Sequence, residues 1–333
     1  MIMRKLFNTL FVIIAAMVTF AGCAKEEVNA PANETKTVQF IAESIETKTA
    51  FGTPDGTTYP TLWTANDMKV HVSMNLTSSD AVAVVPSDDF QTARFETSVT
   101  DDGTGAYTFY SVSPASACIS FNNSYKSYNV EIPTVQNPTA NSVDEKAQII
   151  VAKSGQFSVL PSSVNLTYSH LTAYGKMTLA NLNLDGAVIS SVALTASKNF
   201  AFRYYYYPES GTTEENGASK TITINTTSAS DIWFACAPVD MSNSTMIVVV
   251  NTDKGTFTKT ITFPADRKFE AGKIAKFSVD MKDISLVAPK VYELVANSAD
   301  LTEGSQVVIV GGSYAMSTNQ KTNNRGTYQE ILK

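Results

Sequence analysis

Residues that could perform acid–base, nucleophilic or metal chemistry are few in this chain and lie far apart. Only two histidines are present, His71 and His170. A zinc hydrolase would need a His-Glu-x-x-His pair and a serine hydrolase a Gly-x-Ser-x-Gly turn, because these spacings hold the reacting groups together. Neither motif occurs. We therefore expect no catalytic residue and no enzyme activity, and we expect both histidines to be structural.

Two pairs of adjacent aspartates, Asp88-Asp89 and Asp101-Asp102, are the best candidates for a cation site. Calcium needs six to eight oxygen ligands, more than a pair of adjacent aspartates can supply. Adjacent aspartates in a hairpin turn normally face water. The sequence thus predicts no metal and no other cofactor.

The most suggestive surface feature is an aromatic run, Arg203-Tyr204-Tyr205-Tyr206-Tyr207-Pro208. Successive side chains of a strand point to opposite faces, so two of these four tyrosines should face away from the core. An outward tyrosine pair could stack on a sugar or contact a protein partner. We predict Tyr204, Tyr205, Tyr206 and Tyr207 as a candidate partner-binding site. The alternative is an edge strand whose tyrosines only cover the rim of a sheet.

The first 23 residues have the pattern of an export signal. Arg4 and Lys5 precede an apolar stretch from Leu6 to Phe20, which is too short to span a membrane and ends at Ala21-Gly22-Cys23. This end resembles the lipobox of bacterial lipoproteins, in which the cysteine is acylated. We predict a signal peptide over 1–22, lipidation of Cys23 and a polar tether over 23–36. Ordinary secretion with cleavage near Ala21 is the alternative.

Composition excludes nucleic acid as a partner. The chain carries a formal net charge of −6, and its lysines and arginines are scattered singly along the sequence, so no basic field is expected. Hydrophobic residues make up 44% of the chain, which is enough for sizeable cores. The two remaining cysteines, Cys118 and Cys236, lie more than 100 positions apart in apolar contexts. They suit two separate core positions better than a disulfide.

An alternation of apolar and polar residues dominates the mature chain. Val70, Val72 and Met74 alternate with polar residues, and 256–263 places threonines on one face and Phe257, Ile261 and Phe263 on the other. Asp185-Gly186 and Asn216-Gly217 match tight hairpin turns. Helical periodicity is nearly absent. The sequence predicts an all-β protein of short antiparallel strands packed as sandwiches.

Breaks in this pattern suggest how the chain divides. Breakers at 153–155 and 161–163 predict an N-terminal β-sandwich over 37–160 and a C-terminal β-sandwich over 161–285. After Ala288-Pro289 the residues again read as strands, but some 40 residues cannot easily bury a core alone. We expect 286–333 to be a C-terminal β extension: either a truncated third module or a strand donor.

Several stretches between Thr37 and Met281 resemble the fimbrillin-like proteins of Bacteroidetes, which include type V fimbrial subunits and related surface lipoproteins. The stretches are Phe40-Ile41-Ala42-Glu43-Ser44, Leu62-Trp63-Thr64, Asp67-Met68-Lys69-Val70, Tyr107-Thr108-Phe109-Tyr110-Ser111-Val112-Ser113-Pro114, Ile132-Pro133-Thr134-Val135-Gln136, Ser169-His170-Leu171-Thr172-Ala173 and Phe269-Glu270-Ala271-Gly272-Lys273. Their order and spacing carry the likeness. The charged residues Lys25, Glu26 and Glu27 after Cys23 are similar to the signals of surface-exposed lipoproteins in that group.

The resemblance implies two transthyretin-like β-sandwiches and a structural or adhesive subunit, or the anchor, of a fimbria at the outer membrane. It also implies assembly with other fimbrial subunits by strand exchange, in which the first strand is removed and a neighbour's strand replaces it. Subunits of the shaft are cut after an arginine near that strand. Here the first arginine after Cys23 is Arg94, so a different protease or an uncut subunit is expected. The alternative function is a monomeric surface lipoprotein that binds a host glycan or protein.

Overall fold

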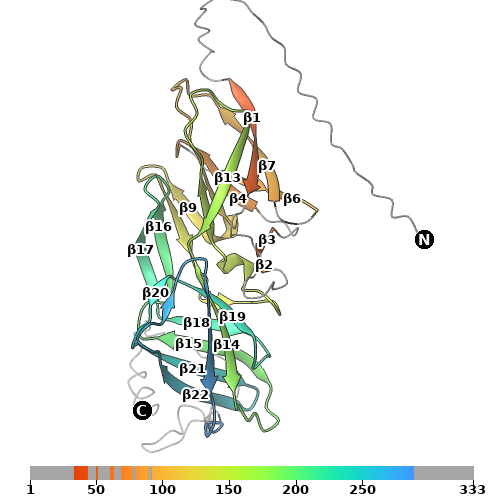
Figure 1. Ribbon diagram of the computed structural model, residues 1–333, viewed down its shortest axis with the longest axis vertical. Coiled ribbons are helices and arrows are strands. Elements are labelled where there is room, and N and C mark those ends of the chain that lie inside the picture. The colour runs from red at the N-terminus through yellow and green to blue at the C-terminus, as the bar shows by residue number, and fades with distance from the viewer. Residues whose placement is uncertain are drawn as a thin grey trace, which may run out of the picture.

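The computed structural model describes residues 34–43, 50–51, 61–63, 69–77, 80–88, 90 and 92–288. Within them the chain forms strands and two short 3-10 turns, η1 (Ala115–Ala117) and η2 (Glu145–Ala147), and no α-helix. The all-β prediction is confirmed. No helix in the described part could cross a membrane. Figure 1 shows an elongated molecule with β1 at one end and β21 and β22 toward the other.

The largest sheet of the described residues has eight strands and holds the first strand in its interior. Its order is β5 (Asp80–Ala83), β4 (Lys69–Met74), β8 (Phe109–Ser113), β12 (Ile150–Lys153), β13 (Ser163–His170), β1 (Thr35–Glu43), β7 (Thr92–Thr100) and β6 (Val85–Pro86). The short pair β2 (Ala50–Phe51) and β3 (Thr61–Leu62) stands apart from it. Alternate residues of β4, β7 and β13 are buried, as period-two patterning requires.

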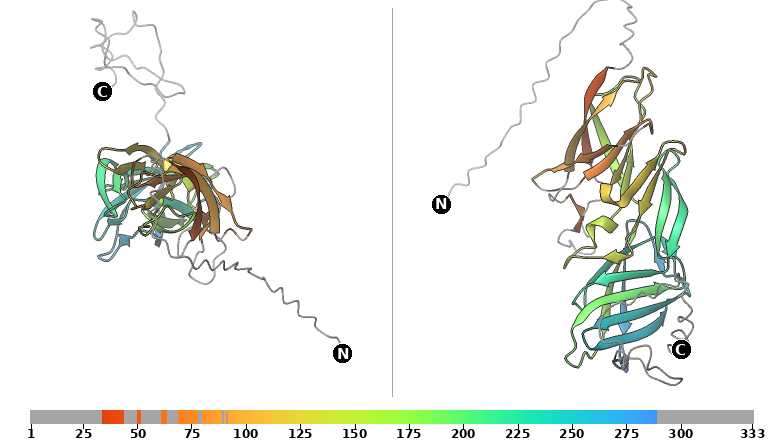
Figure 2. Two further views of the ribbon diagram at one scale, coloured as in Figure 1. Left: turned by 90° about the horizontal axis from the view of Figure 1, so that it is seen from above. Right: turned by 180° about the vertical axis from the view of Figure 1, so that it is seen from behind.

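A four-stranded sheet joins the two halves of the chain. Its order is β17 (Thr212–Ser219), β16 (Ala201–Tyr207), β10 (Ser127–Glu131) and β9 (Cys118–Asn122). The hairpin β16–β17 comes from the second half and pairs with β10 of the first, with Tyr204 opposite Val130. Figure 2 shows this hairpin reaching along the side of the molecule toward the first half.

Two further sheets form the rest of the C-terminal half. Their orders are β11 (Val135–Gln136), β18 (Thr221–Asn225), β15 (Ile189–Ala196), β21 (Thr245–Thr252), β22 (Gly255–Thr262) and, separately, β19 (Ile232–Cys236), β14 (Ala173–Ala180), β24 (Ile274–Asp280). A small ladder pairs β20 (Val239–Asp240) with β23 (Lys268–Phe269). Phe200, Phe234 and Phe269 meet in the core at centroid distances of 5.4–6.0 Å.

The expectation of purely antiparallel sheets is wrong at three strand pairs. β1 runs parallel to β13, β14 parallel to β24, and β11 parallel to β18. Each parallel pair joins strands far apart in sequence, with long stretches of chain between them. Alternation of apolar residues shows which face of a strand is buried but carries no information on the direction of its partner.

The strand pairing crosses the division expected at residue 160 in three places, and one of them is the pairing of β11 from the first half with β18 of the second. β13 follows that residue, yet it lies in the first sheet between β12 and β1. The hairpin β16–β17 also belongs to the second half and pairs with β10 of the first. A division into sandwiches over 37–160 and 161–285 therefore stays a prediction, and the sheets show that the two parts share strands.

Candidate functional site

β1 occupies a slot between two strands that do not otherwise touch in the sheet. It pairs with β7 along nine residues, from Thr35 opposite Thr100 to Glu43 opposite Thr92. On its other side it pairs with β13 along five residues, from Gln39 opposite Ser163 to Glu43 opposite Thr167. The backbone groups of both neighbours are therefore satisfied by β1 along this length.

The inner face of β1 contributes three side chains to the core of the first half. Val38, Phe40 and Ala42 are fully buried, at 0% exposure. The Phe40 ring stacks on Phe95 of β7 at 5.0 Å and meets the edge of Phe109 at 5.2 Å. Burying a Val or Phe side chain contributes about 1.5–3 kcal/mol relative to exposure, so the slot has an apolar floor that must be covered.

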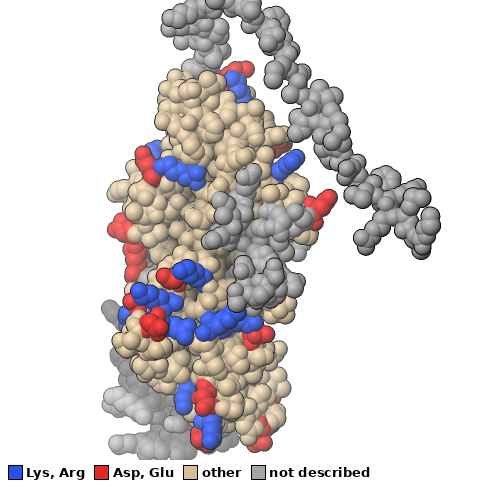
Figure 3. Space-filling model, in the orientation of Figure 1, with Lys and Arg blue, Asp and Glu red and all other residues tan. Residues whose placement is uncertain are grey.

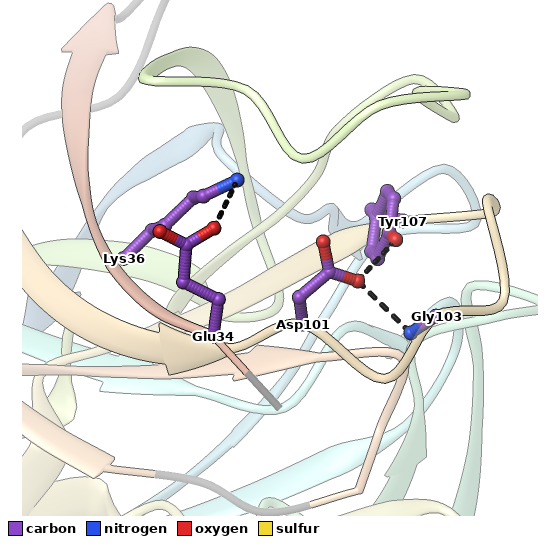
Figure 4. Close-up of polar contacts among 5 residues, drawn as sticks. All are labelled: Glu34, Lys36, Asp101, Gly103 and Tyr107. Atoms are coloured by element: carbon purple, nitrogen blue, oxygen red, sulfur yellow. Dashed lines mark hydrogen bonds and ion pairs between the residues drawn. The ribbon is translucent and has the colours of Figure 1, made fainter. Parts of the chain in front are cut away.

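The start of β1 is fixed by contacts with the loop after β7 (Figure 4). The Asp101 N–H donates to the Glu34 carbonyl at 2.9 Å. The buried Asp101 carboxylate accepts hydrogen bonds from the Tyr107 hydroxyl at 2.5 Å and the Gly103 N–H at 2.9 Å. The bond from Tyr107 is the main reason that the pKa of Asp101 is lowered. The Lys36 ammonium pairs with Glu34 at 3.2 Å.

Taken without β1, this slot would be a binding site for an extended peptide. Two strands, β7 and β13, would each expose unpaired backbone donors and acceptors, and the floor beneath would be apolar. An incoming strand satisfies both needs at once, since its backbone completes the ladders and its alternate side chains fill the core.

The tyrosine run lies on β16 and alternates as a strand requires. Tyr204 and Tyr206 are buried at 7% and 4% exposure, whereas Tyr205 and Tyr207 are partly exposed. Burial raises the pKa of Tyr206 to about 12. The Tyr207 hydroxyl donates to Glu214 of β17 at 2.9 Å, and this bond is the main cause of its raised pKa. β17 covers one side of β16 and β10 the other, so β16 is not an edge strand.

The two histidines lie on different strands with aromatic neighbours. His71 lies on β4, with its ring 6.3 Å from that of Tyr128. His170 ends β13, and its Nδ1 is 2.6 Å from the Tyr174 hydroxyl. Tyr174 also accepts a hydrogen bond from Thr172, so this group links β13 with β14.

The aspartates considered for a cation site and the two cysteines each contact other groups of the protein. Asp102 accepts hydrogen bonds from Thr104 and from Asn75, and Asp101 is held as described above. Among the described residues, no group of three or more His, Cys, Asp or Glu side chains is close enough to hold a metal. Cys118 and Cys236 are free thiols, and burial raises the pKa of Cys118 to about 12.

Several predicted features lie outside the described residues. These are the lipidated Cys23 with its signal peptide and tether, the segment around Lys48 after β1, Asp89, and residues 289–333.

Sequence reasoning missed one group of charges. Lysines and arginines gather around a hollow near the start of β24, lined among others by the adjacent pair Arg267-Lys268 and by Lys273 and Lys276. Four cations within ten positions could have indicated this group from the sequence. The loop that brings them together, however, carries no recognisable motif.

Comparison with known proteins gives structural matches only. No protein-family model matches the sequence, and no curated protein matches it. A "putative cell adhesion protein" from Bacteroides uniformis matches with 14% identity and a TM-score of 0.45, over 76% of this chain and 97% of that one. A fimbrial assembly protein from Parabacteroides distasonis matches with 12% identity and a TM-score of 0.37, over 76% and 94%.

A third match is the tip fimbrial protein Mfa3 from Porphyromonas gingivalis, in a C-terminally truncated form. It has 10% identity and a TM-score of 0.37, over 76% of this chain and 99% of that one. The chain is thus structurally similar to proteins described as fimbrial or as cell adhesion proteins of the Bacteroidales.

Proposed function

We propose that this chain is a structural or adhesive subunit of a cell-surface fimbria, or its anchor, and that it assembles with other fimbrial subunits by exchange of β1. In this proposal Cys23 is lipidated and attaches the protein to the outer membrane, facing outward. The role is non-catalytic. The observation that supports it best is the position of β1, which lies inside an eight-stranded sheet and fills an apolar slot between β13 and β7.

The connectivity of β1 makes it the strand best suited to leave. It is the first strand of the described chain, so a single cut after Glu43 would separate it from everything that follows. Any other interior strand of this sheet is tied at both ends and would need two cuts. Removal of β1 would also leave the long ladder of β7 and the shorter one of β13 open together.

The donor strand in this proposal comes from residues 289–333 of a neighbouring subunit. The stretch Ser305 to Val310 ends in four consecutive apolar residues, so whichever face it turned inward would offer two of them to the floor under Val38, Phe40 and Ala42. The last described residues lie beside β22, since Val287 bridges Thr256. β22 and β1 lie toward opposite ends of the molecule, which suits a head-to-tail polymer (Figure 1).

The position of Arg94 argues against an arginine-specific cut. Arg94 lies in β7 directly opposite Ile41, so cleavage there would break one wall of the slot. We therefore propose that maturation, where it occurs, uses another protease acting after Glu43, for which Lys48 is the nearest basic residue. A subunit that is not cut would retain β1 and serve as an anchor.

Cells that make the protein provide the test of fimbrial function. Unboiled detergent extracts should contain a ladder of multimers, and mass spectrometry should find ladder subunits whose N-terminus lies after residue 43. Deletion of residues 289–333 should abolish the ladder while leaving the monomer. If only monomers beginning at Cys23 are found in cells that bear fimbriae, the assembly role is wrong.

A second candidate function is favoured by the outer face of the four-stranded sheet. Tyr205 and Tyr207 project from this face, and their neighbour Tyr125 is 71% exposed. A monomeric surface lipoprotein could use this aromatic group to stack on a host glycan or contact a host protein. This function predicts saturable binding that is lost in Tyr205→Ala with Tyr207→Ala, and no polymer on the cell.

A further inference from the structure

A hollow of about 400 Å³ on the C-terminal half is lined mainly by charged side chains. Its lining comprises Asp266, Arg267, Lys268, Glu270, Lys273, Ile274, Ala275 and Lys276. We propose that this hollow binds a sulfated glycan. Figure 3 shows lysine and arginine side chains gathering on this face of the lower half, whereas cations are sparse over the upper half.

The loop that carries these cations has a fixed backbone. The Met241 N–H donates to the Arg267 carbonyl at 2.9 Å, and the Gly272 N–H donates to the Thr172 carbonyl at 2.9 Å. Between them, Phe269 is 1% exposed and packs in the aromatic core. Charged groups on a fixed backbone lose less conformational entropy when they bind a ligand than groups on a mobile loop.

The charge balance of the hollow opposes that of the whole chain. Four cations and two carboxylates line it, a local net charge of +2 in a chain of −6. The Glu270 carboxylate is paired with the Lys273 ammonium at 2.7 Å, which lowers its pKa. Lys198 and the Asp240 carboxylate also lie near Lys268, since both lysines lower the pKa of Asp240, and this added pair leaves the charge balance unchanged. An anion with several charges is therefore the complementary ligand.

Arg267 gives the hollow a directed donor. Its Nη1 donates to the Lys276 carbonyl at 3.3 Å, and its guanidinium carbon lies 6.0 Å from the centroid of the Phe263 ring. These two contacts restrict the orientation of the planar guanidinium. A held guanidinium matches the oxygens of a sulfate or phosphate group through two parallel hydrogen bonds, which an ammonium cannot form.

The position of the hollow favours a glycan over a lipid headgroup. It lies beside β23 and β24 in the half of the molecule away from β1 (Figure 1). This step rests on the proposed function, in which the protein's own membrane is attached on the N-terminal side. A competing explanation is that β24 is an edge strand and that its lysines only prevent it from pairing with other sheets. In that case the hollow binds no ligand.

Binding of a size-defined heparin oligosaccharide to the full-length protein tests the proposal by calorimetry at physiological salt. The variant Lys268→Gln with Lys276→Gln changes two exposed cations of the hollow. Each charge-assisted bond lost should weaken binding about tenfold or more. The matched control is Lys220→Gln with Lys282→Gln, two exposed lysines outside the hollow, and its affinity should equal that of the wild type.

Three comparisons complete the experiment. Arg267→Lys keeps the positive charge but loses the planar guanidinium that forms two parallel hydrogen bonds. This variant should therefore also bind heparin more weakly. Desulfated heparin should not bind. The proposal is overturned if heparin does not bind, or if both double variants lower the heparin affinity equally. It is also overturned if anionic lipid vesicles or duplex DNA bind as tightly as heparin or more tightly. None of these results depends on strand exchange, so the fimbrial proposal is tested separately.

Discussion

At the scale of single residues, Phe40 is the main apolar contact by which β1 is held. Its ring is fully buried between Phe95 and Phe109. Replacing it with alanine leaves a cavity, because the two partner rings belong to other strands and cannot both close in.

Phe40→Ala should therefore lower the free energy of unfolding by about 3–5 kcal/mol. Urea denaturation measures this change. Gln39→Ala is the matched control, since Gln39 is the exposed neighbour on the same strand, and its effect should stay within about 0.5 kcal/mol. Equal effects of the two substitutions would show that Phe40 is not buried as described.

Asp101 makes the start of β1 sensitive to acid. The hydrogen bonds from Tyr107 and Gly103 favour the carboxylate, so the pKa of Asp101 is lower in the folded than in the unfolded chain. A lowered folded pKa means that the group stabilises the fold at pH values above its unfolded pKa of about 3.9. This stabilisation is lost as the pH falls through the lower, folded value.

Asp101→Asn should therefore be less stable than the wild type at pH 7, and the difference should shrink below about pH 4. Thermal unfolding followed over this pH range measures it. Asp88→Asn, a change at an exposed aspartate, serves as the control, and its stability at pH 7 should stay within about 0.5 kcal/mol of the wild type. A difference between Asp101→Asn and wild type that is the same at every pH would contradict the argument.

At the scale of elements, the strands could be predicted from the sequence, but their partners could not. Alternation located β4 and β22, and it predicted that only two of the four tyrosines of β16 face the core. The pair Asp185-Gly186 does form a turn, with both residues at positive φ and a hydrogen bond from Ala187 to Leu184, but it is not the hairpin that was predicted, since β14 and β15 lie in different sheets. These features depend on a few neighbouring residues, which is why local patterns show them.

The turn predicted at Asn216-Gly217 is wrong. Both residues lie within β17, where the register against β16 shifts, and Gly217 has a φ of 107°. A glycine at positive φ inside a strand marks a bulge as readily as a turn. Strand direction, the shared sheet of β10 and β16 and the gathered cations depend on residues distant in sequence, so no local pattern predicted them.

At Gly175 the backbone of β14 lies directly against the ring of Phe234. A Cβ placed there would lie 2.0 Å from the Phe234 ring, which is buried against Phe200 and Phe269 and has no room to move. Gly175→Ala should destabilise the protein by about 1–3 kcal/mol or more through overpacking. Gly217→Ala, at a site with open space, should cost only the strain of its positive φ. Chemical denaturation compares them, and a smaller effect at Gly175 would refute the described packing.

At the scale of the whole molecule, the hairpin β16–β17 makes the two halves one cooperative unit. It adds two strands of the second half to the sheet of β9 and β10. Buried Tyr204 and Tyr206 of this hairpin lie in the same core cluster as Tyr128 and Val130. Separate folding of the halves would break this sheet, so the wild type should unfold in a single calorimetric transition.

Tyr205→Pro should split that transition into two, because proline removes a backbone donor from the middle of the shared sheet. Tyr205→Ala keeps the backbone and should retain one transition. Differential scanning calorimetry distinguishes the two variants. A single transition for both would mean that the hairpin does not couple the halves.

Replacement of β1 by another strand can be measured on a protein that has been nicked after β1. A specific protease site placed within 44–49 allows the folded chain to be cut behind β1 without removing it. The nicked protein is then mixed with a labelled peptide of residues 34–43 or 303–312, and the same peptide of β1 with Phe40→Lys is the control.

Both native peptides should become stably bound and displace β1, whereas the lysine peptide should not enter. Nicked protein with β1 removed should also form multimers. A nicked chain that stays folded, takes up neither peptide and remains a monomer after the loss of β1 would contradict strand exchange.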